Sequence, residues 1–526
     1  MRQILGKREV RAILEKRFEN DIHTKISQIP LPCHLKDTYK ASSRIKTAIE
    51  NNERIAIVGD YDVDGIVSSV ILAEFFDLLG AIYRVKIPNR FSDGYGLNPK
   101  VLDDLDDVTL IITVDNGISA VEAANECKKR GIDLIITDHH MPPPTLPDAY
   151  AIINPKQHEC PFPNVEICGA EVAWYLVGAL KEVCAIEYDM SSQLDLLVMA
   201  IIADMMELRD LNRVLVKMGI KKLNSSKRPC FGVIKNYYNK DSFEFDDISF
   251  LIAPLINATG RMSDATLSYK FLRSKSYKEA NAFFEKILAL NHSRKAEEKN
   301  LYECSLPNIS ENDEIIVTWG NNWHEGVIGI VASRLTKVYK KPAIVFSVDE
   351  HRAKGSARSV GKFDILRLIA MQKELLLSFG GHKGAAGIVI EPSKLEEFKV
   401  AINSACFLQD IDISPYSDEI LGEIDLKEVD LEMLDILEFF EPYGQKNPKP
   451  IFSISSALVK SVRMIGKEAN HLKITVEKDG TTKDALFFNY DIKPKEGDSV
   501  SFIATIIKNS FKGKITPEFV IKEILE

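Results

Sequence analysis

Short apolar runs alternate with longer mixed segments through the first third of the chain. Residues 55–58, 110–114 and 134–137 are apolar at nearly every position, which is typical of strands buried on both faces. The segments at 65–80 and 119–131 have the length of helices, and each ends in a glycine. A further apolar run follows at 149–153. The alternation predicts a parallel sheet covered by helices, with Ser119 capping the second helix.

Charged and imidazole side chains follow three of these predicted strands. They are Asp60, Asp62 and Asp64 after the first, Asp115 after the second, and Asp138, His139 and His140 after the third. Parallel strands end at one edge of their sheet, so these groups are expected to meet there. Carboxylates so close together repel one another unless a cation lies between them. Oxygen ligands with an imidazole favour manganese or magnesium over zinc.

Each of these residues also has a simpler interpretation when taken alone. An aspartate after a strand commonly caps a helix, and the spacing of Asp60, Asp62 and Asp64 also occurs in calcium loops. The EF-hand pattern requires a later glutamate, however, and Gly65 leads directly into an apolar helix. The coincidence of three strand ends therefore favours a metal site.

Composition sets limits on the function. The 526 residues are 45% hydrophobic and 27% charged, as in a folded protein of three or four domains. The net charge of −9 gives no sign of a nucleic-acid partner, so any such contact needs a local basic patch. Eight cysteines without a CxxC pair suit a reducing compartment. Since no apolar stretch reaches ~18 residues, we expect a cytoplasmic protein without a membrane span.

The second half predicts two further domains. Residues 279–305 read as a long helix of mixed charge that links two lobes, and a new α/β domain starts near Glu314. In that domain, residues 351–362 carry four basic side chains and no acid, and residues 379–387 are rich in glycine. This pattern predicts phosphate binding, with an exposed basic hairpin as the alternative. From Leu421 onward, short alternating runs predict a small β-barrel that either binds DNA or is purely structural.

The motifs resemble those of a known superfamily. GDYDVDG, TVDNGIS and TDHH, at 59–65, 113–119 and 137–140, resemble the successive motifs of the DHH phosphoesterases. PNRFSDGYGL, CGAEVAWYL, NATGRM, WHEGVIGIVASRL, KGSARS and FGGHKGAAG extend the resemblance over nearly the whole chain, and they are similar to the RecJ family of single-stranded-DNA-specific exonucleases. The resemblance implies an α/β fold with a parallel-sheet DHH domain, a long helix, a smaller α/β DHHA1 domain and an OB-like β-barrel. The implied divisions are an N-terminal lead at 1–40, then 41–278, 279–305, 306–408 and 409–526.

The resemblance also assigns expected roles to residues. Two divalent cations, Mn²⁺ or Mg²⁺, would be held by Asp62, Asp64, Asp115, His139 and Asp204, with Asp115 between them. The catalytic residues beside the ligands would be Asp60, outside the ligand set, and His140, which would hold the scissile phosphate or assist the ligands. The 5′ phosphate would be bound by Arg90, Ser356 and Arg358, with Arg261 and His382 at nearby phosphates. Leu255 stands where the family commonly has arginine, which would weaken one phosphate contact, and Glu207 stands where proline is common.

The implied activity is 5′-to-3′ hydrolysis of single-stranded DNA to 5′-mononucleotides, in DNA repair and recombination. The implied partners are DNA with a 5′ end, a single-stranded-DNA-binding protein and a RecQ-type helicase, and the expected state is a monomer. Two alternatives stay open at this point. One is a DHH phosphodiesterase for short oligonucleotides or cyclic dinucleotides, although such enzymes lack the barrel. The other is a non-catalytic replication scaffold, although such proteins have lost ligands that this chain retains.

Overall fold

The computed structural model describes residues 4–310, 312–361, 363–406, 420–466, 469–490, 492–511 and 513–525. The expected boundary at 408/409 and Lys362 of the basic segment lie outside these residues. The chain divides into two compact units. The larger unit contains Pro30–Asp204 and Met218–Pro415, and the smaller unit contains Met1–Ile29, Met205–Lys217 and Tyr416–Glu526.

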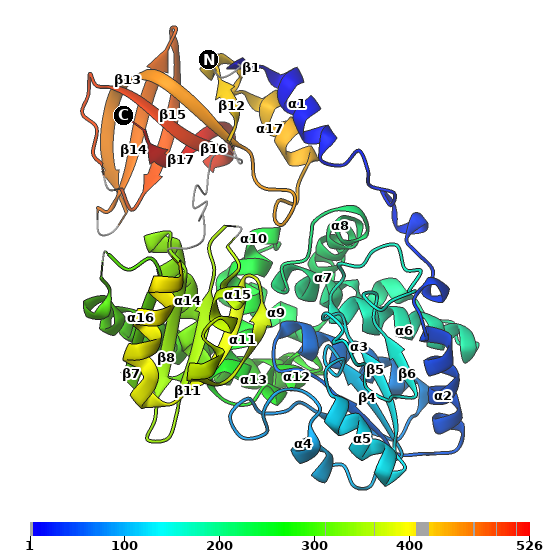
Figure 1. Cartoon of the computed structure of the whole chain (residues 1–526). Helices are drawn as coiled ribbons and strands as arrows, with labels where there is room; N and C mark the ends of the chain where they lie inside the picture. The colour runs from blue at the N-terminus through cyan, green and yellow to red at the C-terminus, as the bar shows by residue number, and fades with distance from the viewer. Residues whose placement is uncertain are drawn as a thin grey trace. The chain divides into compact units, whose positions relative to one another are not determined.

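The first sheet of the larger unit has five parallel strands in the order β3-β2-β4-β5-β6. Figure 1 labels β4, β5 and β6 of this sheet. Their bounds are β2 Ile55–Val58, β3 Tyr83–Lys86, β4 Leu110–Val114, β5 Asp133–Thr137 and β6 Ala151–Ile153. The predicted parallel sheet is confirmed. Strand β3 was missed because Arg84 and Lys86 interrupt it and its side chains are only partly buried, so it lacks the continuous apolar run of its neighbours.

Helices cover this sheet. Its flanking helices are α2 Thr38–Glu50, α3 Val63–Leu79, α4 Pro99–Asp103, α5 Val121–Arg130 and α6 Gly169–Val183. Helix α7 Leu194–Ala203 packs against α3 and α6. Helix α3 is buried along most of its length, which explains its nearly uniform apolar sequence, and it ends at Gly80 with φ 65°. The prediction that Ser119 caps α5 was wrong. Ala120 precedes the helix without a side-chain cap from any described residue, because residues 117–120 first form a separate turn.

Helices α8 Asp210–Asn224, α9 Pro229–Tyr238, α10 Phe245–Asp247, α11 Ala253–Met262 and α12 Thr266–Leu272 lead to the long helix α13 Tyr277–Ser305. Its 29 residues span about 44 Å at 1.5 Å per residue. This confirms the predicted connecting helix.

The second sheet has the order β10-β11-β9-β8-β7, in which β7 and β8 are parallel and the other pairs antiparallel. Its elements are β7 Ile316–Asn321, α14 Glu325–Tyr339, β8 Ala343–Val348, β9 Ala353–Arg358, α15 Ile365–Ala370, β10 Leu376–His382, β11 Ala385–Ile390 and α16 Leu395–Cys406. Strand β9 carries half of the predicted basic segment, including Lys354 and Arg358. It lies between β11 and β8 and alternates buried with half-buried positions, so the alternative of an exposed basic hairpin was wrong.

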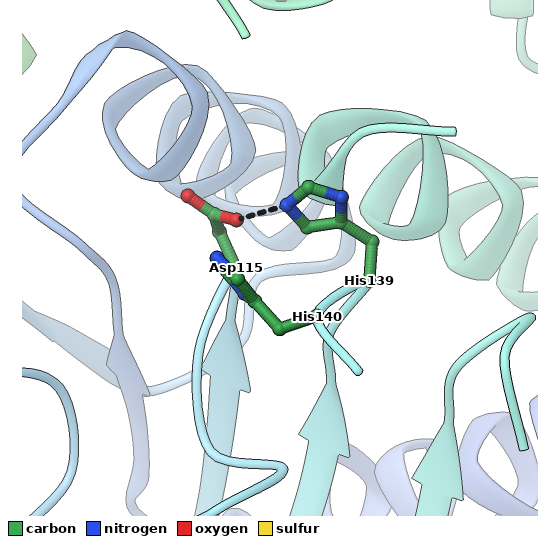
Figure 2. Close-up of side chains that lie close together, drawn as sticks. All are labelled: Asp115, His139 and His140. Carbon is green, nitrogen blue, oxygen red and sulfur yellow. Dashed lines mark ion pairs between the residues drawn. The ribbon is translucent and has the colours of Figure 1, made fainter. Parts of the chain in front are cut away.

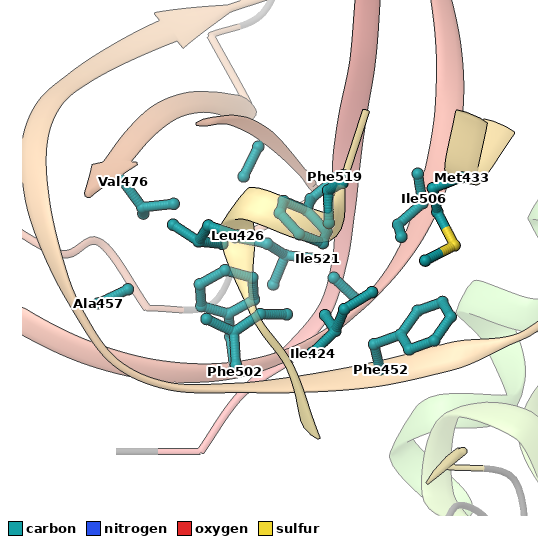
Figure 3. Close-up of a cluster of buried hydrophobic side chains, with 14 of the residues drawn as sticks. Ile424, Leu426, Met433, Phe452, Ala457, Val476, Phe502, Ile506, Phe519 and Ile521 are labelled. Carbon is teal, nitrogen blue, oxygen red and sulfur yellow. The ribbon is translucent and has the colours of Figure 1, made fainter. Parts of the chain in front are cut away.

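The smaller unit contains a closed five-stranded barrel, which confirms the β-barrel prediction. Its order is β13-β14-β15-β17-β16, and β16 pairs again with β13. The strands are β13 Ile451–Ile465, β14 His471–Lys478, β15 Thr481–Phe488, β16 Ser499–Phe511 and β17 Lys514–Ile524. Phe452, Phe502 and Phe519 fill its interior (Figure 3). Helix α17 Leu431–Phe439 contributes Met433 to the same core.

The N-terminal segment belongs to this unit. Strand β1 Ile4–Leu5 pairs in parallel with β12 Ile420–Ile424, which in turn pairs with β13. Helix α1 Lys7–Lys16 adds Val10 and Leu14 to the barrel core. Within the described residues, we find no helix whose length and apolar character would let it cross a membrane.

Candidate metal centre

The loop after β2 is fixed by its own aspartates. Oδ1 of Asp62 accepts hydrogen bonds from the backbone N–H groups of Asp64 (3.0 Å) and Gly65 (3.1 Å), so Asp62 caps α3. Asp60 accepts from the N–H of Tyr61 at 2.7 Å. A Cβ at Gly65 would lie 2.5 Å from the backbone nitrogen of Asp60, so only glycine allows this tight strand-to-helix turn.

Helix α6 begins against this cluster. The N–H groups of Gly169 and Ala170 donate to the carboxylate of Asp64 at 2.6 and 2.7 Å. The partial positive charge at a helix N-terminus stabilises such an anion. A Cβ on Gly169 would lie 2.6 Å from Oδ1 of Asp115, so the glycine lets the helix start directly above two aspartates. This contact accounts for the glycine of the CGAEVAWYL motif.

Asp115 and His139 face each other from neighbouring strand ends (Figure 2). Oδ1 of Asp115 lies 3.2 Å from Nε2 of His139. Asp115 has φ 63°, a left-handed conformation that is uncommon for residues other than glycine and that clusters at functional sites. At this left-handed position the carboxylate faces the histidine of the next strand.

Asp204 completes the cluster from a helix end. It follows α7, and its Oδ2 lies 3.6 Å from Nε2 of His139, which is itself 3.7 Å from Oδ2 of Asp64. The strand pattern could not predict Asp204, because the residue sits at the C-terminus of an apolar helix that looks like ordinary core. Asp204 was expected as a ligand only from the resemblance to the family's motif.

The electrostatics of the cluster favour binding of a cation. Burial, followed by the charge of Asp62, raises the pKa of Asp60 to about 8. Burial and neighbouring carboxylates raise the pKa values of Asp64, Asp115 and Asp204 as well. Burial lowers the pKa of His139 to about 4, which keeps its imidazole neutral, as metal binding needs.

The donor atoms fit divalent cations. Within the described residues, Oδ1 of Asp115 and Oδ2 of Asp204, which lie nearest to Nε2 of His139, are buried without hydrogen-bond partners. Candidate ligand atoms gather within 4.8 Å in three groups, namely Asp64 with His139 and Asp204, Asp60 with Asp62 and Asp115, and Asp115 with His139 and His140. These groups combine carboxylate oxygens with imidazole, the donor set predicted for Mn²⁺ or Mg²⁺. The second group places a carboxylate oxygen of Asp60 within 4.8 Å of oxygens of Asp62 and Asp115, although Asp60 was expected outside the ligand set.

Asp138 has a role that sequence reasoning did not assign. Its Oδ1 accepts from the N–H groups of His139 and His140 and lies 2.7 Å from Nδ1 of His140, while Oδ2 accepts from the N–H of Ile118. Burial lowers the pKa of His140, but the hydrogen bond and charge of Asp138 outweigh it and raise that pKa to about 9. The imidazolium is therefore held in place, with a positive charge beside the acidic cluster.

Three arginines gather beside the centre. Arg90 lies over the ring of Tyr61, with its guanidinium carbon 4.2 Å from the ring centroid. Arg261 donates to the carbonyl of Gly326 at 3.3 Å, and Arg358 donates to Oγ of Ser356 at 3.0 Å.

The three arginines repel one another. Burial, and then the charges of Arg90 and Arg358, lower the pKa of Arg261 to about 10. Among the residues that the structure describes, none of the three forms an ion pair with a carboxylate. An anion at this place would relieve their repulsion.

Glycines of α14 make room for this group. A Cβ at Gly326 would lie 1.9 Å from the carbonyl oxygen of Arg261, and a Cβ at Gly329 would lie 2.9 Å from both Ser356 and Arg358. His382, at the end of β10, is exposed and has His140 as an electrostatic neighbour. Leu255 is fully buried, so the residue at this position packs in the core.

Comparison with known proteins agrees with this geometry. Models of the DHH family N-terminal domain, the DHHA1 domain and the RecJ OB domain match residues 54–201, 312–406 and 420–523. RecJ of Bacillus subtilis, a single-stranded-DNA-specific exonuclease, is 32% identical over 95% of this chain, which spans 65% of that protein. RecJ of Salmonella typhimurium is 32% identical over 91% of this chain and 88% of its own length. The chain belongs to the RecJ family.

Solved RecJ structures share the fold. RecJ from Thermus thermophilus in complex with Mn²⁺ is 25% identical with a TM-score of 0.84, covering 100% of this chain and 79% of that one. Its Mg²⁺ complex is 24% identical with a TM-score of 0.78, covering 100% and 78%. Mn²⁺ and Mg²⁺ are thus bound in RecJ structures, and this chain carries candidate Asp and His metal sites.

Proposed function

We propose that this chain is a single-stranded-DNA-specific exonuclease that degrades DNA from the 5′ end and releases 5′-mononucleotides. The observation that carries the proposal is the position of the arginine group beside the acidic cluster. Arg90 stacks on Tyr61, and Tyr61 lies between Asp60 and Asp62 in the same loop. A strand whose terminal phosphate is bound by the arginines would place its first phosphodiester next to the metal centre.

The proposed metal ligands are Asp62, Asp64, Asp115, His139 and Asp204, with Asp115 shared and Asp60 beside it. Bound Mn²⁺ or Mg²⁺ would supply Lewis acidity for phosphodiester hydrolysis. The chain's own groups would position the substrate. His140, oriented by Asp138, would hold the scissile phosphate as an imidazolium.

The terminal phosphate would be bound by groups from β9, from α11 and from the loop after β3. Arg358 offers a planar guanidinium next to the hydroxyl of Ser356, and Arg261 approaches from α11. Arg90 adds charge from the loop after β3, and His382 would contact an adjacent phosphate. Because the pocket takes a terminal monoester, it favours 5′-phosphorylated strands and excludes internal cleavage.

The barrel would contribute a DNA-binding surface. His471 and Phe488 pack edge to face at 5.1 Å, and Phe488 and Met464 are about half exposed. Exposed aromatic rings at the end of an OB-type barrel are suited to stacking with unpaired bases. We also propose the domain divisions 41–278, 306–408 and 409–526 for the DHH, DHHA1 and barrel parts, with 279–305 as the connecting helix.

The test is digestion of end-labelled DNA with Mn²⁺ present. Single strands with a 5′ phosphate should be degraded to mononucleotides from that end, and blunt duplexes should resist. Degradation from the 3′ end would refute the proposed polarity. Hydrolysis of dinucleotides with no action on long single strands would favour the small-substrate phosphodiesterase alternative.

A further inference from the structure

Helix α6 carries a buried glutamate that the metal-ligand set does not use. Glu171 is the third residue of this helix, and its side chain is fully buried. Its Oε2 accepts a hydrogen bond from the backbone N–H of Cys168, the residue before the helix, at 2.8 Å. A fully buried acidic side chain is costly to keep in a fold, and the contacts around Glu171 indicate what it does.

Three consecutive N–H groups at the start of α6 donate to two carboxyl groups. The N–H of Cys168 donates to Glu171, whereas those of Gly169 and Ala170 donate to the two oxygens of Asp64. Consecutive peptide groups are rigid planes that share one Cα atom. A change in the orientation of the Cys168 peptide therefore shifts the two N–H groups that hold Asp64.

The start of α6 needs such a contact because a loop leads into it. Residues 154–168, between β6 and α6, form no helix or strand. The body of α6 packs against α2 and α3, which fixes the helix axis but not the peptide that precedes the helix. Glu171 ties the last residue of the loop to the first turn, as the glutamate of a capping box does.

The carboxyl group of Glu171 acts here as an acceptor and not as a charge. Burial, only partly opposed by the hydrogen bonds with Cys168, raises the pKa of Glu171 to about 8, and the charge of Asp64 raises it further. A neutral carboxyl adds no negative charge to the acidic cluster. An amide oxygen at the same place would accept the same hydrogen bond.

We propose that Glu171 is a positioning residue of the metal centre, which keeps the N–H groups of Gly169 and Ala170 directed at Asp64 through its hydrogen bond to Cys168. Each oxygen of Asp64 accepts one N–H group and keeps a lone pair for a cation. Glu171 contacts neither cation nor substrate, so its effect is on the affinity for the metal. The inference rests on Asp64 being a metal ligand, as proposed above.

The first experiment is calorimetric titration of the full chain with Mn²⁺ in the absence of DNA, so that the result does not depend on nuclease activity. Loss of a group that orients a metal ligand costs roughly 10- to 100-fold in metal affinity. Because Glu171 acts one step behind such groups, Glu171→Ala should weaken Mn²⁺ binding about tenfold. Glu171→Gln should bind Mn²⁺ nearly as tightly as the wild type, since its amide oxygen still accepts from Cys168. Unchanged affinity in Glu171→Ala, or an equal loss in both variants, would overturn the proposal.

Asp247→Ala is the matched control for a purely structural effect. Asp247 is the third residue of α10, is buried, and accepts from the N–H of Glu244 at 3.0 Å, so it has the same role at another helix start. It also pairs with Lys240, so its loss is no milder for the fold. Both alanine variants should unfold more readily, but Asp247→Ala should keep the wild-type affinity for Mn²⁺. Equal weakening of Mn²⁺ binding in the two variants would reduce the role of Glu171 to general stability.

Asp64→Asn separates this inference from the ligand assignment. The variant should bind Mn²⁺ much more weakly than the wild type, because a charged ligand is lost. Normal binding by Asp64→Asn would refute the ligand assignment, and the role of Glu171 with it. Weak binding by Asp64→Asn together with normal binding by Glu171→Ala would refute the positioning role alone.

Discussion

Gly169 offers a sharp test of the candidate metal centre because it touches the site without being a ligand. It is the first residue of α6, its N–H donates to Asp64, and its missing Cβ leaves space for Asp115. Gly169→Ala keeps the backbone compatible with a helix and removes no charge or donor. Any loss of activity must therefore come from displacement.

The expected magnitude follows from the contact. The new Cβ would lie 2.6 Å from Asp115, whereas ordinary contact begins at 3.4 Å, so about 0.8 Å of movement is needed. Displacing a catalytic constellation by ~1 Å costs roughly 100-fold in rate. Overpacking costs about 1–3 kcal/mol of stability, and the better helix propensity of alanine offsets up to ~1 kcal/mol of this. We expect about 100-fold lower kcat/KM and a net destabilisation of at most ~3 kcal/mol.

The assay is steady-state digestion of a 5′-phosphorylated single strand across a Mn²⁺ titration, with the free energy of unfolding measured in parallel. Gly232→Ala in α9 is the control, because its Cβ would meet nothing closer than 4.0 Å, and it should leave kcat/KM unchanged. Combining Gly169→Ala with Asp115→Asn should be no worse than Asp115→Asn alone, since both act through Asp115. If Gly169→Ala keeps activity within twofold of the wild type, the proposed role of Asp115 is wrong.

Three further predictions concern the cations, the terminal phosphate and the barrel. Mn²⁺ at 100 times its Kd should stabilise the wild type by about 2.7 kcal/mol. The variant Asp115→Asn should lose most of this stabilisation and its activity. An equal rise in Tm in both proteins would contradict the assignment of Asp115 as a ligand. Arg358→Ala should abolish the preference for a 5′ phosphate over a 5′ hydroxyl. Arg334→Ala, at an exposed arginine outside the three-arginine group, should keep this preference. A preference that survives Arg358→Ala would place the phosphate elsewhere. Phe488→Ala should weaken binding of long single strands by about 1–3 kcal/mol per lost stacking contact and leave binding of a very short oligonucleotide nearly unaffected. Leu525→Ala, at another exposed apolar residue of the same unit, is the control. Unchanged long-strand affinity in Phe488→Ala would make the barrel structural.

Truncation is a poor test of the barrel. A cut near residue 410 would leave β1, α1 and residues 205–217 without the unit in which they pack. Val10 and Leu14 would then lose their buried environment, so the shortened chain would suffer from exposed apolar surface as well as from loss of DNA contact. Single substitutions at exposed barrel residues separate these effects.

The sequence alone determined the features that depend on local patterns. Continuous apolar runs identified four of the five parallel strands, because strands buried on both faces need apolar residues at nearly every position. The placement of Asp62, Asp115 and His139 after those strands predicted one metal-binding edge, because parallel strands share their ends. The alternating runs after residue 420 likewise predicted the barrel.

Only the tertiary structure decided which distant segments share the site. Asp204 reaches His139 from a helix end, Gly169 touches Asp115, and Asp138 orients His140 through contacts that no periodicity records. Arg90, Arg261 and Arg358 stand far apart in the sequence, yet they come close enough for their charges to oppose one another. The pairing of β1 with β12 joins the start of the chain to a strand that follows the second sheet. Such contacts depend on how whole elements pack, and a local apolar pattern fixes which face an element buries but not which partner covers it.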